Sequence, residues 1–173
     1  QSSEHLTTID FPHARIHAKK SFTTHFDNEV TNIGEMSVIA FNAPSSDEVH
    51  FRMTVESTHN AIAYLYLHTS INVDEGTSVT PSCRSQAAPL GTSGLTSITT
   101  SPVANRLTTL NETQAASANI TTTTELDHLH LVGGEGPRAL GANVSDREEW
   151  IGDDSTQFAI VIVAGTNDDV EHS

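Results

Sequence analysis

The sequence has little cysteine, little lysine and no long hydrophobic run. Its single cysteine, Cys83, excludes an intrachain disulfide and gives no support to a zinc site built on thiolates. No stretch of 18 apolar residues is present, so no membrane-spanning helix is expected. Eight Lys and Arg stand against 22 Asp and Glu, a balance that disfavours the clustered phosphate contacts of nucleic-acid binding. We therefore expect neither nucleic acid nor a membrane as a partner.

Threonine and serine are abundant instead. The chain holds 23 Thr and 18 Ser among its 173 residues. Threonine is β-branched and favours the pleated, half-buried surface of a strand, whereas serine favours turns. A chain of this length suits one domain with its own core. The composition therefore predicts a single all-β domain.

Three segments give the clearest strand signals. From Glu48 to Glu56, apolar and polar residues alternate over nine positions, which predicts a strand with one buried and one wet face. Residues 57–60 then read as a hairpin connection. Residues 61–67 and 157–164 are apolar at nearly every position, which predicts central strands buried on both faces.

The remaining segments are less regular. Residues 1–25 are predicted to form an N-terminal arm, which is either extended or a first edge strand, and residues 26–173 the β-sandwich domain. Residues 74–94 are rich in Gly, Pro and Ser, and a long excursion of this kind usually makes contacts or carries function. Further expectations are a hairpin from 95–101 and 105–110, a long strand in 120–132, and Ala115–Ala118 as the one weak helix candidate.

Short strands separated by turn signals predict an antiparallel β-sandwich that resembles a jelly roll. An immunoglobulin-type sandwich is less favoured because its paired cysteines are missing. We expect the core of the sandwich to contain the large apolar residues Phe51, Met53, Tyr64, Trp150 and Phe158.

Two histidines are the main candidates for metal chemistry. His128 and His130 lie two residues apart, hence on one face of a strand, and imidazole is a good zinc or nickel ligand. A site needs three or four ligands, and Asp127 is expected on the opposite face. The alternative is a histidine face packed beneath a loop or at a subunit contact. We predict no metal and no cofactor.

The sequence offers little to an enzyme. No serine lies in a Gly-x-Ser-x-Gly elbow, and Ser93 comes closest with the wrong spacing. Five adjacent acidic pairs could in principle serve glycoside hydrolysis or calcium binding. Their scatter over turn segments, without a calcium-loop motif, favours a solvated acidic surface. We therefore predict that the protein is not an enzyme.

The excess of acidic residues bears on the salt concentration in which the protein is stable. A net charge of −14 destabilises a compact fold by self-repulsion. Molar salt shortens the Debye length to about 3 Å and removes most of that penalty. The surface therefore suits a protein of a high-salt environment, with an ordinary acidic protein as the alternative.

Several motifs resemble a known family. Arg147-Glu148-Glu149-Trp150-Ile151, followed by the apolar run of 155–163, resembles the ending of small head proteins of tailed viruses, the capsid decoration or auxiliary proteins. Glu75-Gly76-Thr77, with Val79, Pro81 and Arg84 downstream, is similar to an upstream segment of that family. His17 to Phe22 resembles an early one.

The resemblance implies a structural virion protein on the outer surface of the capsid, present in the host cytoplasm during assembly. It implies the major capsid protein as partner and a homotrimer. The acidic surface adds a halophilic archaeal host. The expected contact residues are Arg15, His17, Lys19, Lys20 and Arg84. The alternative is a carbohydrate- or receptor-binding sandwich on a viral fibre, a turret or a cell surface, which the scarcity of aromatics disfavours.

Overall fold

A computed structural model of the chain shows a predominantly β protein with antiparallel sheets, as the composition predicts. The finer jelly-roll assignment stays a prediction. The structure describes residues 11–30, 32–45, 47–67, 70–72, 76–98, 104–111, 113–114, 119–121, 124–133, 138–140, 150–153, 156–165 and 170–172. None of the helices within these ranges is long and apolar enough to cross a membrane.

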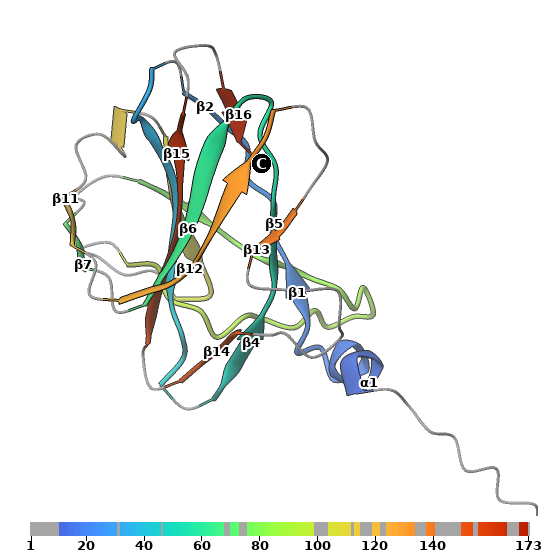
Figure 1. Cartoon of the computed structure of the whole chain (residues 1–173). Helices are drawn as coiled ribbons and strands as arrows, with labels where there is room; N and C mark the ends of the chain where they lie inside the picture. Colours follow the sequence, from blue (N-terminus) through green and yellow to red (C-terminus); the bar gives the residue numbers. More distant parts are fainter. Residues whose placement is uncertain are drawn as a thin grey trace, which may run out of the picture.

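A six-stranded antiparallel sheet forms the centre of the molecule (Figure 1). Its strands follow the order β12, β6, β15, β3, β10 and β8. Their bounds are β3 Met36–Asn42, β6 Ala61–Leu67, β8 Thr77–Val79, β10 Leu107–Leu110, β12 Thr124–Leu131 and β15 Gln157–Ala164. The two predicted central strands are confirmed in position, because β6 lies between β12 and β15, and β15 lies between β6 and β3.

Within the described ranges, five two-stranded ribbons complete the strand pairing. They pair β1 (Phe22–Thr23) with β9 (Ser82–Cys83), β2 (Asn28–Val30) with β16 (Val170–His172), β4 (Val49–Phe51) with β14 (Trp150–Gly152), β5 (Met53–Val55) with β13 (Arg138–Leu140), and β7 (Ser70–Asn72) with β11 (Asn119–Thr121). Every pair is antiparallel. Antiparallel ribbons leave one face free for solvent, in keeping with the polar composition.

The six-stranded sheet buries apolar side chains on both faces. The larger cluster joins Phe158 and Leu65 of the sheet to Met53 and Val55 of β5, with Phe51 and Trp150 packed against it. The second cluster contains Val38, Ala40, Leu110, Ala159 and Val161 on the opposite face. Successive side chains of a strand point to opposite faces, so β15 supplies both clusters, as a strand apolar at every position should.

Phe158 is the centre of the larger cluster. It is 1% exposed, and its ring centroid lies 4.7 Å from that of Phe51 and 5.6 Å from that of Phe41. Met53 is buried as well, whereas Phe51 and Trp150 are half-buried. Tyr64 differs from the expected core position: it is half-buried and lies outside both clusters, because the face of β6 that carries it is only partly covered.

The alternation of residues 48–56 is present, but it belongs to two strands. His50, Arg52 and Thr54 are exposed, while Met53 and Val55 are buried. The strand is interrupted at Arg52. Before it β4 pairs with β14, and after it β5 pairs with β13. The predicted single strand is therefore wrong. Alternation reports which face is buried, and carries no information about the partner strand.

Three connections differ from the sequence-based expectations. Residues 57–60 do not close a hairpin, since β5 pairs with β13 while β6 pairs with β12 and β15. The stretch 120–132 is divided between β11 and β12, which lie in different sheets. Thr96 bridges to Ala104, as a hairpin would require, yet β10 pairs with β3 and β8. Ala115–Ala118 lie outside the described residues.

The N-terminal arm contains a helix where an extended segment was expected. Helix α1 spans Phe11–His17. Its C-terminus is capped by Lys19, whose φ of 60° is left-handed, with Lys20 N donating to Arg15 O and Lys19 N to Ile16 O. This is the Schellman arrangement that closes many helices, usually with glycine at the left-handed position. Because this position is lysine, the sequence lacks the glycine that usually indicates the end of a helix. Residues 1–10 lie outside the described part.

Candidate contact surface

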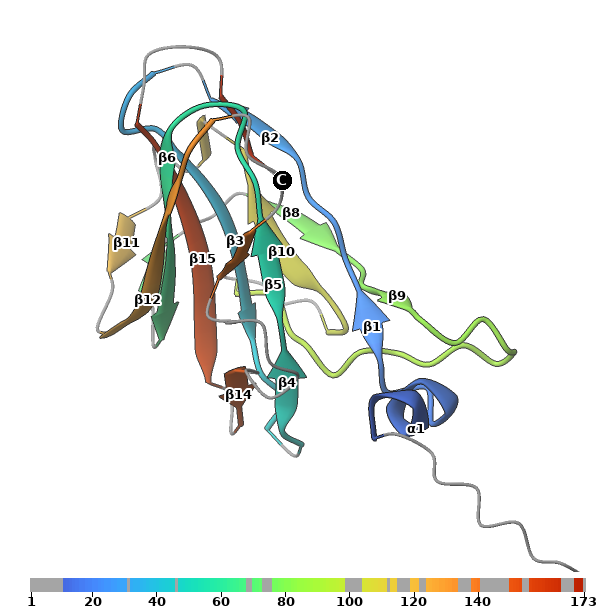
Figure 2. The same ribbon diagram turned by 45° about the vertical axis from the view of Figure 1, so that its right-hand side comes forward.

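The N-terminal segment docks on the loop that follows β9. Phe22 pairs with Cys83 and Thr23 with Ser82, and Arg84 N donates to Ser21 O at 2.8 Å. In Figure 2, α1, β1 and β9 lie to one side of the sandwich, and the loop after β9 extends furthest from it. We call this assembly, residues 11–23 with residues 82–94, the contact lobe.

Two contacts fix the inner part of the contact lobe. Lys19 Nζ donates to Pro89 O at 2.6 Å, which joins the end of α1 to the loop. Gly91 packs against the Lys19 backbone so tightly that a Cβ there would lie 2.3 Å from Lys19 O. Only glycine allows this approach. The loop is thus held in place by specific contacts rather than merely crossing the surface.

The contact lobe is the basic part of an acidic protein. The two acid-free segments that build it and its surroundings, 11–26 and 76–111, contain five of the eight Lys and Arg and none of the 22 Asp and Glu. Their formal charge is therefore +5, which leaves −19 for the other residues of a chain whose total is −14. The charges are therefore segregated along the sequence, and the contact lobe itself contains no acidic residue.

All five residues predicted to make contacts lie in the contact lobe. Arg15, His17, Lys20 and Arg84 are exposed there. Lys19 is half-buried, and its ammonium group bonds the loop, so it supports the lobe from within. The sequence suggested the arm and the 74–94 loop separately. The β1–β9 pairing brings them together.

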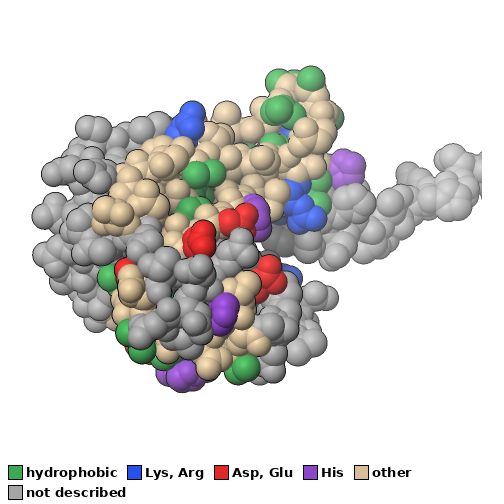
Figure 3. Space-filling model, turned by 90° about the horizontal axis from the view of Figure 1, so that it is seen from above, with side chains coloured by type: hydrophobic (Ala, Val, Ile, Leu, Met, Phe, Trp, Pro, Cys, Tyr) green, Lys and Arg blue, Asp and Glu red, His purple; other side chains and the backbone are tan. Residues whose placement is uncertain are grey.

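The tip of the contact lobe is apolar, a feature that sequence reasoning missed. Leu90 is 58% exposed, beside the exposed residues Ala87, Ala88 and Pro89. Figure 3 shows hydrophobic side chains gathered at the end of this projection, and acidic side chains on the body of the molecule. The short apolar run Ala87–Leu90 inside a polar loop was the available signal. Exposed apolar groups rimmed by polar ones often mark contact sites.

A second outward surface lies on the β4–β14 ribbon. Trp150 pairs with Phe51 and faces the core, so the next pair, Ile151 with His50, faces outward. Gly152 and its partner Val49 face inward again. The residues next to them, Asp153 and Glu48, therefore face outward. Ile151 is 56% exposed, and Glu48, His50, Asp153 and the adjacent Asp47 are exposed as well. We call these five residues the acidic ribbon face.

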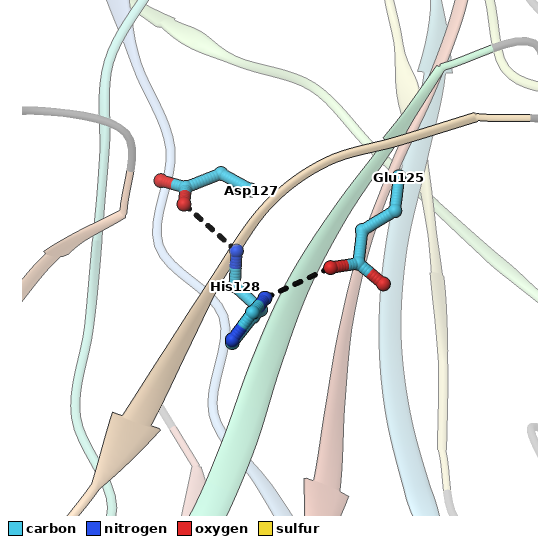
Figure 4. A network of polar contacts seen from close by, with 3 residues as sticks. All are labelled: Glu125, Asp127 and His128. Carbon is cyan, nitrogen blue, oxygen red and sulfur yellow. Dashed lines mark hydrogen bonds and ion pairs between the residues drawn. The ribbon is translucent and has the colours of Figure 1, made fainter.

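His128 and His130 lie on one face of β12, with ring centroids 5.8 Å apart. His128 Nδ1 lies 2.8 Å from Glu125 Oε1, and His128 N donates to Asp127 Oδ1 (Figure 4). The register shift between Glu125 and Asp127 turns Glu125 to the His128 side, which simple alternation could not predict. Within the described ranges no group of three or more metal-ligating side chains gathers.

Two tyrosines continue this row of rings. Tyr64 stacks on Tyr66 with centroids 5.7 Å apart, and Tyr64 lies 6.1 Å from His128. Burial raises the pKa of the Tyr66 phenol above its ordinary value, and the charge of Glu125 and the neighbouring Tyr64 act in the same direction. Tyr64, Tyr66, His128 and His130 thus form one aromatic row along β6 and β12.

Two further candidates from the sequence are buried. Cys83 is 6% exposed within the β1–β9 ribbon, and Ser93 is 4% exposed in the loop. Neither side chain is open to a substrate in this conformation. Trp150 lies against the larger core cluster, and its Nε1 is buried without a hydrogen-bond partner among the described residues.

No protein-family model matches the chain, and no curated protein or solved structure was found to match it.

Proposed function

We propose that this chain is a structural protein of a virus particle, a capsid decoration protein on the outer head surface of a tailed virus. The observation that carries the proposal is the contact lobe, a projecting, acid-free element on a protein of net charge −14. A decoration protein requires a rigid scaffold and an element that reaches neighbouring subunits. The sandwich and the contact lobe supply these two parts.

The charges of the contact lobe support a role in recognition. Exposed Arg15, Lys20 and Arg84 offer donors to an acidic neighbour, such as the major capsid protein or another copy in a homotrimer. Complementary charge across an interface sets register and partner choice more than total affinity. The exposed Leu90 supplies an apolar contact that salt does not screen.

The acidic body supports a halophilic archaeal host. The 121 residues outside the two acid-free segments carry 22 acids and three arginines. At molar ionic strength the Debye length is about 3 Å, so most of the repulsion between such exposed charges is screened. This part of the proposal is separable from the capsid role.

Quantitative mass spectrometry of purified particles tests the capsid role. A decoration protein is present in many copies per particle, in fixed ratio to the major capsid protein. Absence from particles, or one or two copies each, would remove the proposal. Lys20→Glu with Arg84→Glu should reduce incorporation. The matched reversal Glu29→Lys with Glu125→Lys, away from the contact lobe, should not.

The aromatic row favours a second candidate function, binding of a glycan. Tyr64, Tyr66 and His128 combine ring surface with hydroxyl, imidazole and the nearby Glu125 carboxylate, groups that suit a polyhydroxylated ligand. A glycan array tests it. Specific binding that is lost in Tyr64→Ala and kept in the contact-lobe variants would support this function, and an array without signal would remove it.

A further inference from the structure

Two outward surfaces of this chain are complementary to each other. The contact lobe presents Leu90, 58% exposed, and also carries the exposed basic residues Lys20 and Arg84. The acidic ribbon face presents Ile151, 56% exposed, flanked by Glu48 and Asp153. Each surface therefore combines one exposed aliphatic side chain with charged groups. The lobe residues are basic, whereas three acids predominate on the ribbon face, beside His50 and the exposed Arg52.

We infer that the contact lobe of one copy docks on the acidic ribbon face of a second copy. Leu90 then packs on Ile151, and the basic residues of the lobe meet Glu48 and Asp153. The +5 of the acid-free segments and the −19 of the rest make a second copy an electrostatically matched occupant. The inference rests on the proposed structural role and names one neighbour that the lobe contacts.

The placement of the two surfaces defines the kind of assembly. The contact lobe and the β4–β14 ribbon lie apart at the same end of the molecule in both views (Figures 1 and 2). Because the contact joins two different surfaces, each copy can donate one lobe and accept one. Such contacts close reciprocally in a two-fold dimer, close into a larger ring, or continue as a filament.

Aliphatic packing and charge pairing respond differently to salt. Exposed charges are screened at high ionic strength, whereas close, partly buried pairs are screened much less. The Leu90–Ile151 contact does not weaken as salt rises. Self-association should therefore persist from about 0.1 M to molar salt, with charge governing which surfaces meet.

A charge swap tests the pairing of these two surfaces. The lobe variant carries Lys20→Glu and Arg84→Glu, and the ribbon variant carries Glu48→Lys and Asp153→Lys. Sedimentation velocity at about 0.1 M salt, where the Debye length is about 10 Å, should show each variant alone as a monomer and the wild type assembled. An equimolar mixture of the two variants should associate again, because each variant's lobe now matches the ribbon of the other. The two variants must alternate, so the mixture should give dimers, even-membered rings or chains and no closed trimer.

The outcomes that overturn the inference are specific. They are a monomeric wild type, full assembly of each variant alone, or a mixture that stays monomeric while circular dichroism shows both variants folded. The matched control, Glu29→Lys with Glu125→Lys, changes the net charge by the same amount as the ribbon variant and should assemble like the wild type.

A cross-link gives a second readout that needs no charge change. Cys83 is buried, so Leu90→Cys provides one reactive thiol for a photo-cross-linker at the lobe tip. In a mixture of isotopically light and heavy chains, cross-links should join position 90 of one chain to residues 47–51 or 150–153 of the other. Cross-links confined to a single chain, or directed elsewhere, would overturn the inference. Ile33→Cys, at a residue 61% exposed outside both surfaces, is the control.

These measurements use the isolated protein, so they separate the inference from the proposed function. A chain that is monomeric in solution yet abundant in particles would overturn the docking of copies and leave the capsid role standing. A chain that assembles through these surfaces yet is absent from particles would do the reverse.

Discussion

Gly152 lies against the ring of Phe158, and a Cβ at this glycine would be 2.3 Å from Phe158 Cε2. The contact fixes how the β4–β14 ribbon sits on the six-stranded sheet, because Phe158 is at the centre of the larger core cluster. It also fixes the outer face of the ribbon. With Gly152 inward, Ile151 and Asp153 are placed outward.

Gly152→Ala should therefore destabilise the fold. Overpacking of a filled core costs about 1–3 kcal/mol, and here the added methyl group meets a ring that is 1% exposed. Urea denaturation should show a lower midpoint with an unchanged slope. Ile151→Ala, one residue earlier and exposed, should change stability by less than about 0.5 kcal/mol. Equal midpoints for Gly152→Ala and the wild type would show that the ribbon is free to shift.

Trp150→Ala should also destabilise the protein. Truncation of a buried aromatic residue costs about 3–5 kcal/mol, and the half-buried Trp150 should lie at the lower end of that range. The loss of stability is smaller also because Nε1 is already buried without a partner in the described structure. Chemical denaturation gives the value. An unchanged midpoint would mean that the tryptophan does not contribute to the core.

The contact lobe should open without unfolding the sandwich when Gly91 is enlarged. Gly91→Val places side-chain atoms where the Lys19 backbone lies, and so separates the loop from α1. Cys83, buried within the β1–β9 ribbon, should then react faster with a thiol reagent, while the melting temperature changes little. Leu90→Ala, at an exposed neighbouring position, is the control. An unchanged rate of Cys83 labelling in Gly91→Val would contradict this description of the lobe.

The stability of the protein should fall at high pH through Tyr66. Burial raises the pKa of this phenol in the folded state, with smaller contributions from Glu125 and Tyr64. A raised folded-state pKa stabilises the fold fully below the unfolded value of about 10, and this contribution is lost as pH rises above it. Between pH 8 and pH 11 the wild type should lose more thermal stability than Tyr66→Phe. Parallel pH profiles would contradict the assignment.

Salt should raise the melting temperature of the isolated protein. Molar KCl screens the repulsion among its 22 acids, which the eight basic residues do not offset. A variant in which Asp47, Glu48 and Asp153 are changed to the corresponding amides should gain less from added salt, because part of the repulsion is already removed. The same melting temperature in low and molar KCl would argue against adaptation to a saline environment.

The sequence predicts the all-β class because the two signals for it, the high content of β-branched residues and the two apolar segments, can be recognised without knowing which segments pair. It does not predict that the alternating segment 48–56 is divided at Arg52 between two ribbons. Both ribbons bury the same side of this segment, so the alternation of apolar and polar residues continues across the division. Helix α1 was missed since its closing residue is Lys19 in place of the usual glycine. The basic and loop residues of the contact lobe were each identified, but their union depends on the β1–β9 pairing, a contact between distant segments.

A cryo-electron microscopy reconstruction of the virus particle tests the central claim most directly. We expect repeated density for this sandwich on the outer surface of the head, with the contact lobe at the junction between neighbouring subunits. A reconstruction in which the head carries no such density, or in which the protein occurs only at the tail, would contradict it.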